Sequence, residues 1–264
     1  MSTDGRPQQL ARTAHFLELY RAYLVADVDM TRSSVESMEN QWYVPVGHSA
    51  AQVIYSACVG SWLSEVRTVL DMPCGHGRIL RHLTKLFPDA AIHACDIDEA
   101  GLQFCASQFG AHPILSKEIP EEVAFPVQYD CIWVGSLFTH LSKTMSERWL
   151  AHLARQLSPT GILITTWHGR WSAANGAEIQ YIEPDKWRAI LAEYESTGYG
   201  YASYLRGHQH QQYIEGDYGI SLSTPVALME MALAVPDVRV FSFTERGWAG
   251  HQDVLVLGKP QIMA

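Results

Sequence analysis

The 264-residue sequence predicts an α/β fold in which a seven-stranded, mostly parallel sheet carries helices on both faces and ends in an antiparallel hairpin. Two observations support this fold class. Between residues 66 and 168, short apolar runs rich in β-branched residues alternate with helical stretches, as in a parallel sheet with right-handed crossovers. Near the C-terminus, the apolar runs 238–244 and 254–257 lie too close together for a crossover helix, so they should pair as a hairpin.

Residues 1–65 are expected to form a helical cap or lid. Apolar residues recur at helical spacing over residues 8–26, and a polar stretch from Asp27 to Asn40 follows. Ser49 and Gln52 have the spacing of a capping box, which predicts a helix from that point to about Leu63.

Residues 66–264 are expected to form one domain. Its central strands are predicted at residues 66–72, 90–97, 113–115, 129–135 and 162–167. Helices are predicted between them at 77–87, 99–109 and 146–157, with Asp98 capping the second and a turn at 159–161 leading into the fifth strand.

An insertion at about 169–235 separates the fifth strand from the terminal hairpin. It contains predicted helices at 185–196 and 225–234. Between them, the Tyr-, Gly- and His-rich stretch 198–222 is interpreted as an inserted hairpin or lid on the substrate side.

Composition excludes several classes of protein. Hydrophobic residues make up 47% of the chain and charged residues 18%, which is typical of a globular protein with a core. A net charge of −9 without a basic run argues against a nucleic-acid partner and against membrane-surface binding. The five cysteines form no C-x-x-C pair, and the N-terminus has no apolar leader, so we expect reduced thiols and a cytoplasmic location.

The most informative motif is the strand–turn–helix segment from Thr68 to Leu80. A predicted strand ends at Asp71, the turn contains Gly75 and Gly77, and a helix follows. Glycines in such a turn let the backbone approach a ligand, and the carboxylate suits a ligand with a positive amino group. Nineteen positions after Gly77, the next strand ends at Asp96, where it can accept hydrogen bonds from a ribose diol.

This motif resembles that of class I S-adenosylmethionine-dependent methyltransferases of the small-molecule type. The resemblance extends through residues 129–136 and the turn at 159–163, and it includes the terminal hairpin. It implies a Rossmann-like methyltransferase sheet and S-adenosyl-L-methionine as cofactor. The cofactor-binding residues that it implies are Asp71, Cys74, Gly75, Gly77, Arg78, Asp96, Ile97, Ser116, Gly135 and Ser136.

Within this set, the resemblance places Asp71 and the Gly75–Gly77 backbone at the methionine part, Asp96 at the ribose and Ile97 at the adenine. Two departures stand out. Pro73 replaces the family's usual first glycine. The acidic residue often found after the third strand is absent, with Ser116 as the nearest candidate.

Two alternatives to a methyltransferase are considered. A nicotinamide-dependent oxidoreductase shares a glycine-rich turn, but its fingerprint needs a third glycine where Leu80 stands. A methyltransferase-like module that binds the cofactor without turnover is the other alternative.

Candidate catalytic groups follow from topology, because ligands bind beyond the carboxyl ends of the strands. His140 follows the fourth strand and His168 the fifth, so both are candidate general bases, although each can instead have a structural role. The hairpin connection lies at the same edge. The candidate substrate-binding residues are Tyr43, Tyr213, Trp248 and His251.

No metal is expected. His208 and His210 with Tyr213 suggest a metal site, but His-x-His alone is a poor zinc signature and no Cys or carboxylate cluster stands at ligand spacing. Gly135-Ser136 also replaces the Asp that metal-dependent O-methyltransferases carry after the fourth strand. We therefore expect metal-independent O-methylation of a small polar acceptor, such as a sugar or ringed metabolite. A homodimer is possible.

Overall fold

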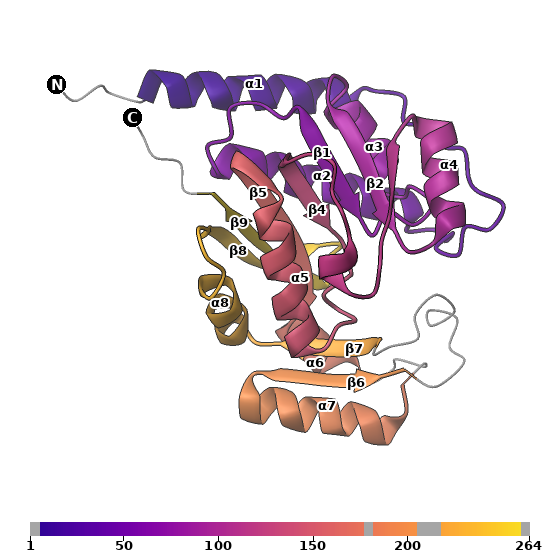
Figure 1. The fold of residues 1–264 in the computed structure, drawn as a ribbon, viewed down its shortest axis with the longest axis vertical. Coiled ribbons are helices and arrows are strands. Elements are labelled where there is room, and N and C mark those ends of the chain that lie inside the picture. The colour runs from indigo at the N-terminus through magenta and orange to yellow at the C-terminus, as the bar shows by residue number, and fades with distance from the viewer. Residues whose placement is uncertain (1–5, 177–181, 205–217, 260–264) are drawn as a thin grey trace.

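A seven-stranded sheet forms the centre of the molecule. The computed structural model describes residues 6–176, 182–204 and 218–259 (Figure 1). The strand order is β3-β2-β1-β4-β5-β9-β8, and β9 runs antiparallel to both of its neighbours. This confirms the predicted fold class. The strands are β1 (Thr68–Met72), β2 (Ala91–Asp96), β3 (His112–Leu115), β4 (Tyr129–Val134), β5 (Leu157–His168), β8 (Arg239–Trp248) and β9 (Gln252–Gly258).

Helices cover both faces of this sheet, each over its own hydrophobic core. One face carries α1 (Arg6–Leu24), α2 (Tyr43–Gly60), α3 (Leu80–Leu86) and α4 (Glu99–Phe109). The other face carries α5 (Lys143–Arg155) and α8 (Pro225–Leu233), and the 3-10 turn η1 (Pro120–Glu122) precedes β4. No helix in the described ranges is both long and apolar enough to cross a membrane.

The N-terminal helices share the core of the sheet domain. Phe16 of α1 and Ile54 of α2 are buried in the same cluster as Val69 of β1 and Trp133 of β4. Helices α1 and α2 thus pack directly onto the sheet domain that follows them. A separate lid ending at residue 65 stays a prediction.

A second layer lies beyond the carboxyl edge of the sheet, at the lower end of Figure 1. It consists of α6 (Arg170–Asn175), α7 (Pro184–Thr197) and the antiparallel pair of β6 (Tyr199–Ser203) and β7 (Gly219–Ser223). A small core around Trp187, Ile190 and Leu222 holds it together. The predicted inserted hairpin is therefore present, and residues 205–217 between its strands lie outside the described part.

The predicted start of the second helix is wrong. Helix α2 begins at Tyr43, six residues before Ser49, so Ser49 is an internal helical residue and no capping box forms. Pro45 does not prevent this, because a proline in the first helical turn removes an N–H that has no partner there. The Ser49 hydroxyl instead accepts a hydrogen bond from the Ala249 backbone N–H, 3.1 Å away.

The predicted turn at residues 159–161 is also wrong, since these residues lie inside β5. Tyr129 of β4 pairs with Leu157 of β5, and Cys131 of β4 pairs with Ile162 of β5, so β5 has extra residues over this stretch. The extra residues form a bulge in which Gly161 lies against the Tyr129 carbonyl.

We predict that Gly161→Ala destabilises the protein by about 1–3 kcal/mol, because a Cβ there would collide with the Tyr129 carbonyl oxygen. Urea unfolding followed by tryptophan fluorescence measures this. Gly60→Ala at the end of α2 is the matched control, since a Cβ there meets nothing within 4 Å. Equal midpoints for the two variants would contradict the bulge geometry.

Candidate active site

The glycine-rich turn between β1 and α3 packs closely against α4. Gly75 and Gly77 both have positive φ, +49° and +79°, which favours glycine. A Cβ on Gly77 would lie 2.6 Å from the Phe109 ring, and a Cβ on Gly101 of α4 would lie 2.5 Å from the Gly75 carbonyl oxygen. A Cβ on Gly75 would meet nothing within 4 Å. The turn is therefore packed tightly on the side that faces α4, while space remains beside Gly75.

Asp71, in β1 next to this turn, is fully buried. Neither of its carboxylate oxygens has a hydrogen-bond partner within the described residues. Burial, and next the charge of Asp96, raise the pKa of Asp71 well above its usual range. An ionised carboxylate here is costly unless a cationic group lies beside it.

Asp96 ends β2 and ties the turn to that strand. One carboxylate oxygen accepts the Gly75 N–H at 2.7 Å, and the other accepts the Asp98 N–H at 3.0 Å. Burial raises the pKa of Asp96, while these backbone hydrogen bonds lower it. Asp71 and Asp96 together place two buried carboxyl groups with raised pKa at this end of the sheet.

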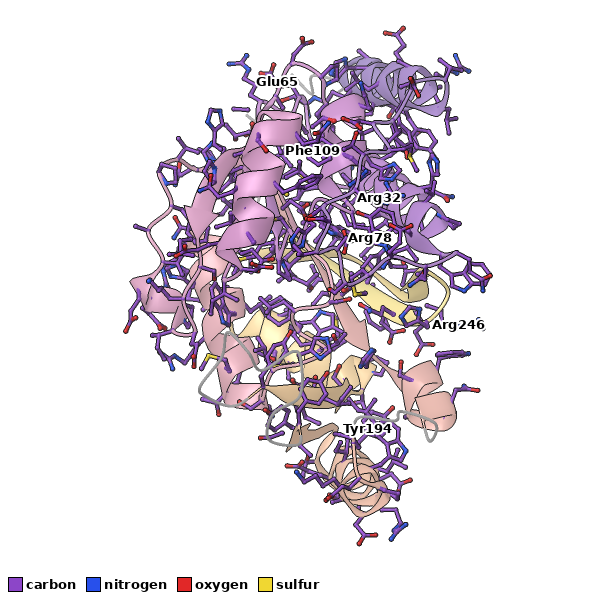
Figure 2. All side chains as sticks on the ribbon, turned by 90° about the vertical axis from the view of Figure 1, so that its right-hand side faces the viewer. Arg32, Glu65, Arg78, Phe109, Tyr194 and Arg246 are labelled. Carbon is purple, nitrogen blue, oxygen red and sulfur yellow. The ribbon has the colours of Figure 1, made fainter. Side chains whose placement is uncertain are left out.

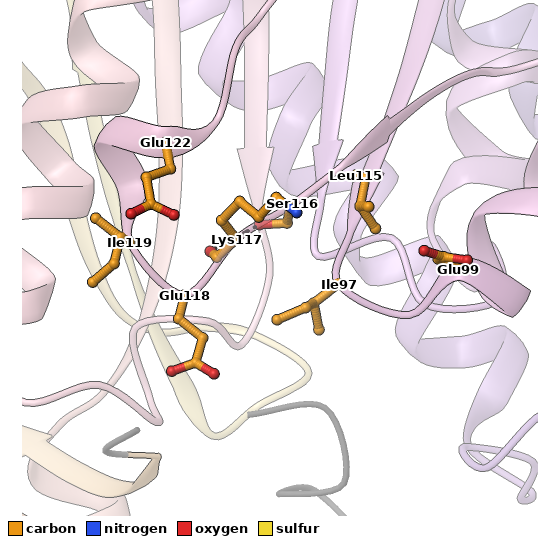
Figure 3. A pocket seen from close by; sticks show the side chains of 8 residues that line it. All are labelled: Ile97, Glu99, Leu115, Ser116, Lys117, Glu118, Ile119 and Glu122. Atoms are coloured by element: carbon orange, nitrogen blue, oxygen red, sulfur yellow. Dashed lines mark hydrogen bonds between the residues drawn. The ribbon is translucent and has the colours of Figure 1, made fainter. Parts of the chain in front are cut away.

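A cavity of about 440 Å³ opens beside the ends of β2 and β3 (Figure 3). Ile97 and Ser116, both expected at the adenine, line it. Glu118 and Glu122 line the same cavity, and neither was predicted. An acidic side chain does therefore follow the third strand, two positions beyond Ser116, and a search that allowed a longer loop would have found it.

Two predicted cofactor residues have structural contacts. Burial and its thiol neighbour Cys105 keep the pKa of Cys74 well above the usual value, with Cys105 the larger cause. Arg78 donates to the Trp42 and Tyr43 carbonyl oxygens, so its guanidinium ties the turn to the start of α2. Figure 2 labels Arg78 near Arg32, and both guanidinium groups lie over the Tyr43 ring.

The Gly135-Ser136 turn at the end of β4 is fixed by a ring of hydrogen bonds. Ser136 has a φ of +63°, and its N–H donates to the Thr166 hydroxyl at 2.8 Å. That hydroxyl donates to the Gln252 side-chain oxygen at 2.6 Å, and the Gln252 amide donates to the Ser136 hydroxyl at 2.8 Å. Thr166 and Gln252 were not predicted, because this ring joins three strands that are distant in sequence.

Three histidines form a row along the carboxyl edge, as their positions after the strands predict. The ring centroids of His140 and His168 are 6.4 Å apart, and those of His168 and His251 are 6.5 Å apart. Tyr218 packs against His140 with its ring centroid 5.0 Å away. Burial, and next the negative charge of Asp96, raise the pKa of Tyr218 above its usual value, so this end of the row lies within the electrostatic reach of Asp96.

The three imidazoles differ in their surroundings. Burial, and then the neighbouring His140 and His251, lower the pKa of His168 to about 3, so His168 is neutral at physiological pH. His251 donates from Nδ1 to the Ala249 carbonyl at 3.1 Å, and its Nε2 lies 3.5 Å from the Gln252 amide nitrogen. His140 contacts the Tyr204 hydroxyl and the Gly219 carbonyl through Nδ1.

The predicted substrate-binding residues do not form one surface. Tyr43 is buried among arginines, and its hydroxyl donates to Glu36 at 2.9 Å. Trp248 is buried against Trp133, and its ring N–H donates to the Val46 carbonyl. Of the predicted set, His251 lies in the histidine row, whereas Tyr213, like His208 and His210, lies outside the described residues. Within the described ranges no group of three or more acidic, His or Cys side chains is arranged to hold a metal ion.

Comparisons with known proteins agree with this architecture. Residues 70–163 match the family model of a methyltransferase domain. The malonyl-[acyl-carrier protein] O-methyltransferase of Halalkalibacterium halodurans is 29% identical over 111 residues, which is 40% of this chain and 40% of that protein. The chain thus matches less than half the length of this curated relative.

Solved structures share the fold over nearly the whole chain. An S-adenosylmethionine-dependent methyltransferase from Clostridium acetobutylicum has a TM-score of 0.56 at 12% identity, covering 93% of this chain and 98% of its own. The plantazolicin methyltransferase BpumL, in complex with SAH, has a TM-score of 0.58 at 13% identity, with coverages of 97% and 99%. The sugar N-methyltransferase KedS8 from Streptoalloteichus has a TM-score of 0.53 at 13% identity, with coverages of 89% and 99%.

The domain match covers the glycine-rich turn and the central strands, and the strand order with its reversed β9 extends the likeness to the terminal hairpin. The chain therefore carries a methyltransferase domain and has the fold of the class I S-adenosylmethionine-dependent methyltransferases.

Proposed function

We propose that the protein transfers a methyl group from S-adenosylmethionine to a hydroxyl oxygen of a small polar acceptor, such as a sugar or a ringed metabolite, without a metal. The observation that carries this proposal is the placement of two buried acids, Asp71 and Asp96, at the same sheet edge as a row of three imidazoles. The cofactor, when bound, supplies an electrophilic methyl group on a positively charged sulfur.

The residues present fit this cofactor. The unpartnered carboxylate of Asp71 suits an ammonium group, and the open side of Gly75 leaves room for the methionine part. Asp96 is placed to hold the ribose hydroxyls. Ile97 and Ser116 offer an apolar surface and a hydroxyl to the adenine, and Glu118 can accept a hydrogen bond from its amino group.

His140 is the best candidate for the general base. A hydroxyl acceptor gains nucleophilicity as it loses its proton, and a base is most effective when its pKa lies near the working pH. With a pKa of about 3, His168 holds a proton too weakly for this role, so we assign it a neutral, hydrogen-bonding part. His251 already faces the Gln252 amide through Nε2.

The surroundings of His140 favour a polar acceptor with hydroxyl groups. Tyr204 and Tyr218 lie beside its ring, and aromatic faces with hydroxyl groups recognise sugars and ringed metabolites. The name of the H. halodurans relative states methylation of oxygen, in keeping with the proposed chemistry. KedS8 is named for nitrogen methylation of a sugar, but a neutral amine needs a base less than a hydroxyl does.

The first prediction concerns the cofactor. We expect S-adenosylhomocysteine to bind the wild type in calorimetric titration, and Asp96→Ala to weaken binding at least about tenfold, since one lost hydrogen bond to a charged group is worth roughly 1.5–3 kcal/mol. Asp89→Ala, at an exposed position before β2, is the control and should bind as the wild type does. Failure of the wild type to bind, with stabilisation by a nicotinamide dinucleotide instead, would overturn the proposal.

The second prediction concerns the base. His140→Gln should lower turnover by about 10²–10⁴-fold, the usual contribution of general-base catalysis, while S-adenosylhomocysteine affinity stays near that of the wild type. Release of S-adenosylhomocysteine in the presence of a panel of sugars, phenols and other hydroxylated metabolites measures this, with the exposed His112→Gln as control. Unchanged turnover in His140→Gln would refute the assignment. If the cofactor binds but neither slow hydrolysis of the cofactor nor product from any acceptor is detected, the result favours a binding module over an enzyme.

The third prediction concerns the cost of the acidic pair. Because the folded-state pKa of Asp71 is raised, its contribution to stability is present at low pH and is lost as the pH rises through that pKa. Without ligand, Asp71→Asn should therefore be more stable than the wild type at pH 7, by about 1 kcal/mol or more, yet bind S-adenosylhomocysteine more weakly. Urea unfolding at several pH values checks this. A variant less stable than the wild type at pH 7 would show that Asp71 has a stabilising partner in the ligand-free protein.

A further inference from the structure

Two oxygen atoms from the inserted hairpin converge on one nitrogen of His140. The Tyr204 hydroxyl oxygen lies 2.7 Å from Nδ1 of His140, and the Gly219 carbonyl oxygen lies 2.8 Å from the same atom. Tyr204 directly follows β6, and Gly219 begins β7, so both strands of the hairpin reach this imidazole.

These contacts select one tautomer of His140. A carbonyl oxygen can only accept a hydrogen bond, so Nδ1 must carry the hydrogen that lies toward Gly219. If Nδ1 were unprotonated, its lone pair would face the carbonyl lone pairs at 2.8 Å, which is repulsive. With the hydrogen on Nδ1, the Tyr204 oxygen can serve as a second acceptor, and the basic lone pair of the neutral ring is on Nε2.

Both oxygen atoms belong to buried residues. Tyr204 is 3% exposed and packs in the small core of the hairpin with Ile190 and Ile220. The Gly219 N–H donates to the backbone carbonyl of His140 at 2.9 Å, so the two residues are joined in both directions. A Cβ at position 219 would collide with the Ala202 carbonyl oxygen, so glycine suits this approach.

We propose that Tyr204 is a positioning residue for methyl transfer: together with the Gly219 carbonyl, it holds His140 in the Nδ1–H tautomer and thereby makes Nε2 the basic atom. This inference rests on the proposed function, in which His140 is the base. The acceptor O–H proton passes to Nε2 while the acceptor oxygen forms a bond to the methyl carbon and the carbon–sulfur bond breaks, leaving a neutral thioether. The imidazolium, stabilised by the two oxygens, then releases its proton to water.

The tautomer can be measured without knowing the acceptor. In protein labelled with ¹⁵N-histidine, we expect the ring nitrogen shifts of His140 to show Nδ1–H in the neutral form, with the His140→Gln spectrum providing the assignment. Tyr204→Phe should lower the titration midpoint of His140 and increase the fraction of the other tautomer. Tyr194→Phe is the control, because its hydroxyl on α7 makes no hydrogen bond within the described residues, and it should leave the His140 signals unchanged.

An Nε2–H tautomer in the wild type, or His140 signals in Tyr204→Phe that match the wild type, would overturn this proposal. S-adenosylhomocysteine titration of the same samples separates it from the proposed function. If the wild type has the expected tautomer but does not bind the cofactor product, the proposed function fails. If it binds but the tautomer is the wrong one, only the role of Tyr204 fails.

Discussion

Two buried carboxylates at the ends of neighbouring strands dominate the energetics of the carboxyl edge. Burial opposes ionisation of both side chains, and the charge of Asp96 raises the pKa of Asp71 further. The Gly75 N–H bonds to Asp96, whereas neither Asp71 carboxylate oxygen has a hydrogen-bond partner of good geometry in the described residues, and only the Leu80 backbone N–H lowers the pKa of Asp71. On its other side the turn packs against α4 through the contact of Gly75 with Gly101, and the cost of ionising Asp71 remains. A cationic ligand is the group that would relieve it.

The second layer of the molecule contributes residues that contact His140 at the carboxyl edge of the sheet. Strand β7 is tied to the loop after β4 by backbone hydrogen bonds from Gly219 to His140 and from Ser221 to Thr139. The inserted hairpin is therefore joined directly to the loop that carries His140. The sheet provides the turn that we propose binds the cofactor, and the insertion provides the surroundings of the candidate base. Differences in such insertions let a common fold act on different substrates.

Local patterns in the sequence predicted the strands, the reversed hairpin and the Asp98 cap of α4, because each depends on residues close in the chain. The predictions that were wrong concern features that depend on contacts between residues distant in the sequence. At the start of α2, the Trp42 and Tyr43 carbonyl oxygens accept hydrogen bonds from Arg78 in the later glycine-rich turn, and in β5 the bulge lies against the Tyr129 carbonyl of its neighbour. The same holds in the site, where Gln252 bonds to Ser136 across 116 positions, a distance that no periodicity reveals.

The three histidines show that the sequence can predict where a side chain lies without predicting its protonation. Topology placed His140, His168 and His251 along one edge, but topology alone treats them as equivalent. Their differences come from burial and from single hydrogen bonds, which lower the proton affinity of the central ring and fix the outer two through Nδ1. Three neighbouring imidazoles cannot all hold a proton near neutral pH, because like charges at these separations repel. A neutral His168 therefore lowers the cost of a transient positive charge on His140. Burial thus makes His168 a poor base and at the same time favours protonation of the neighbouring His140.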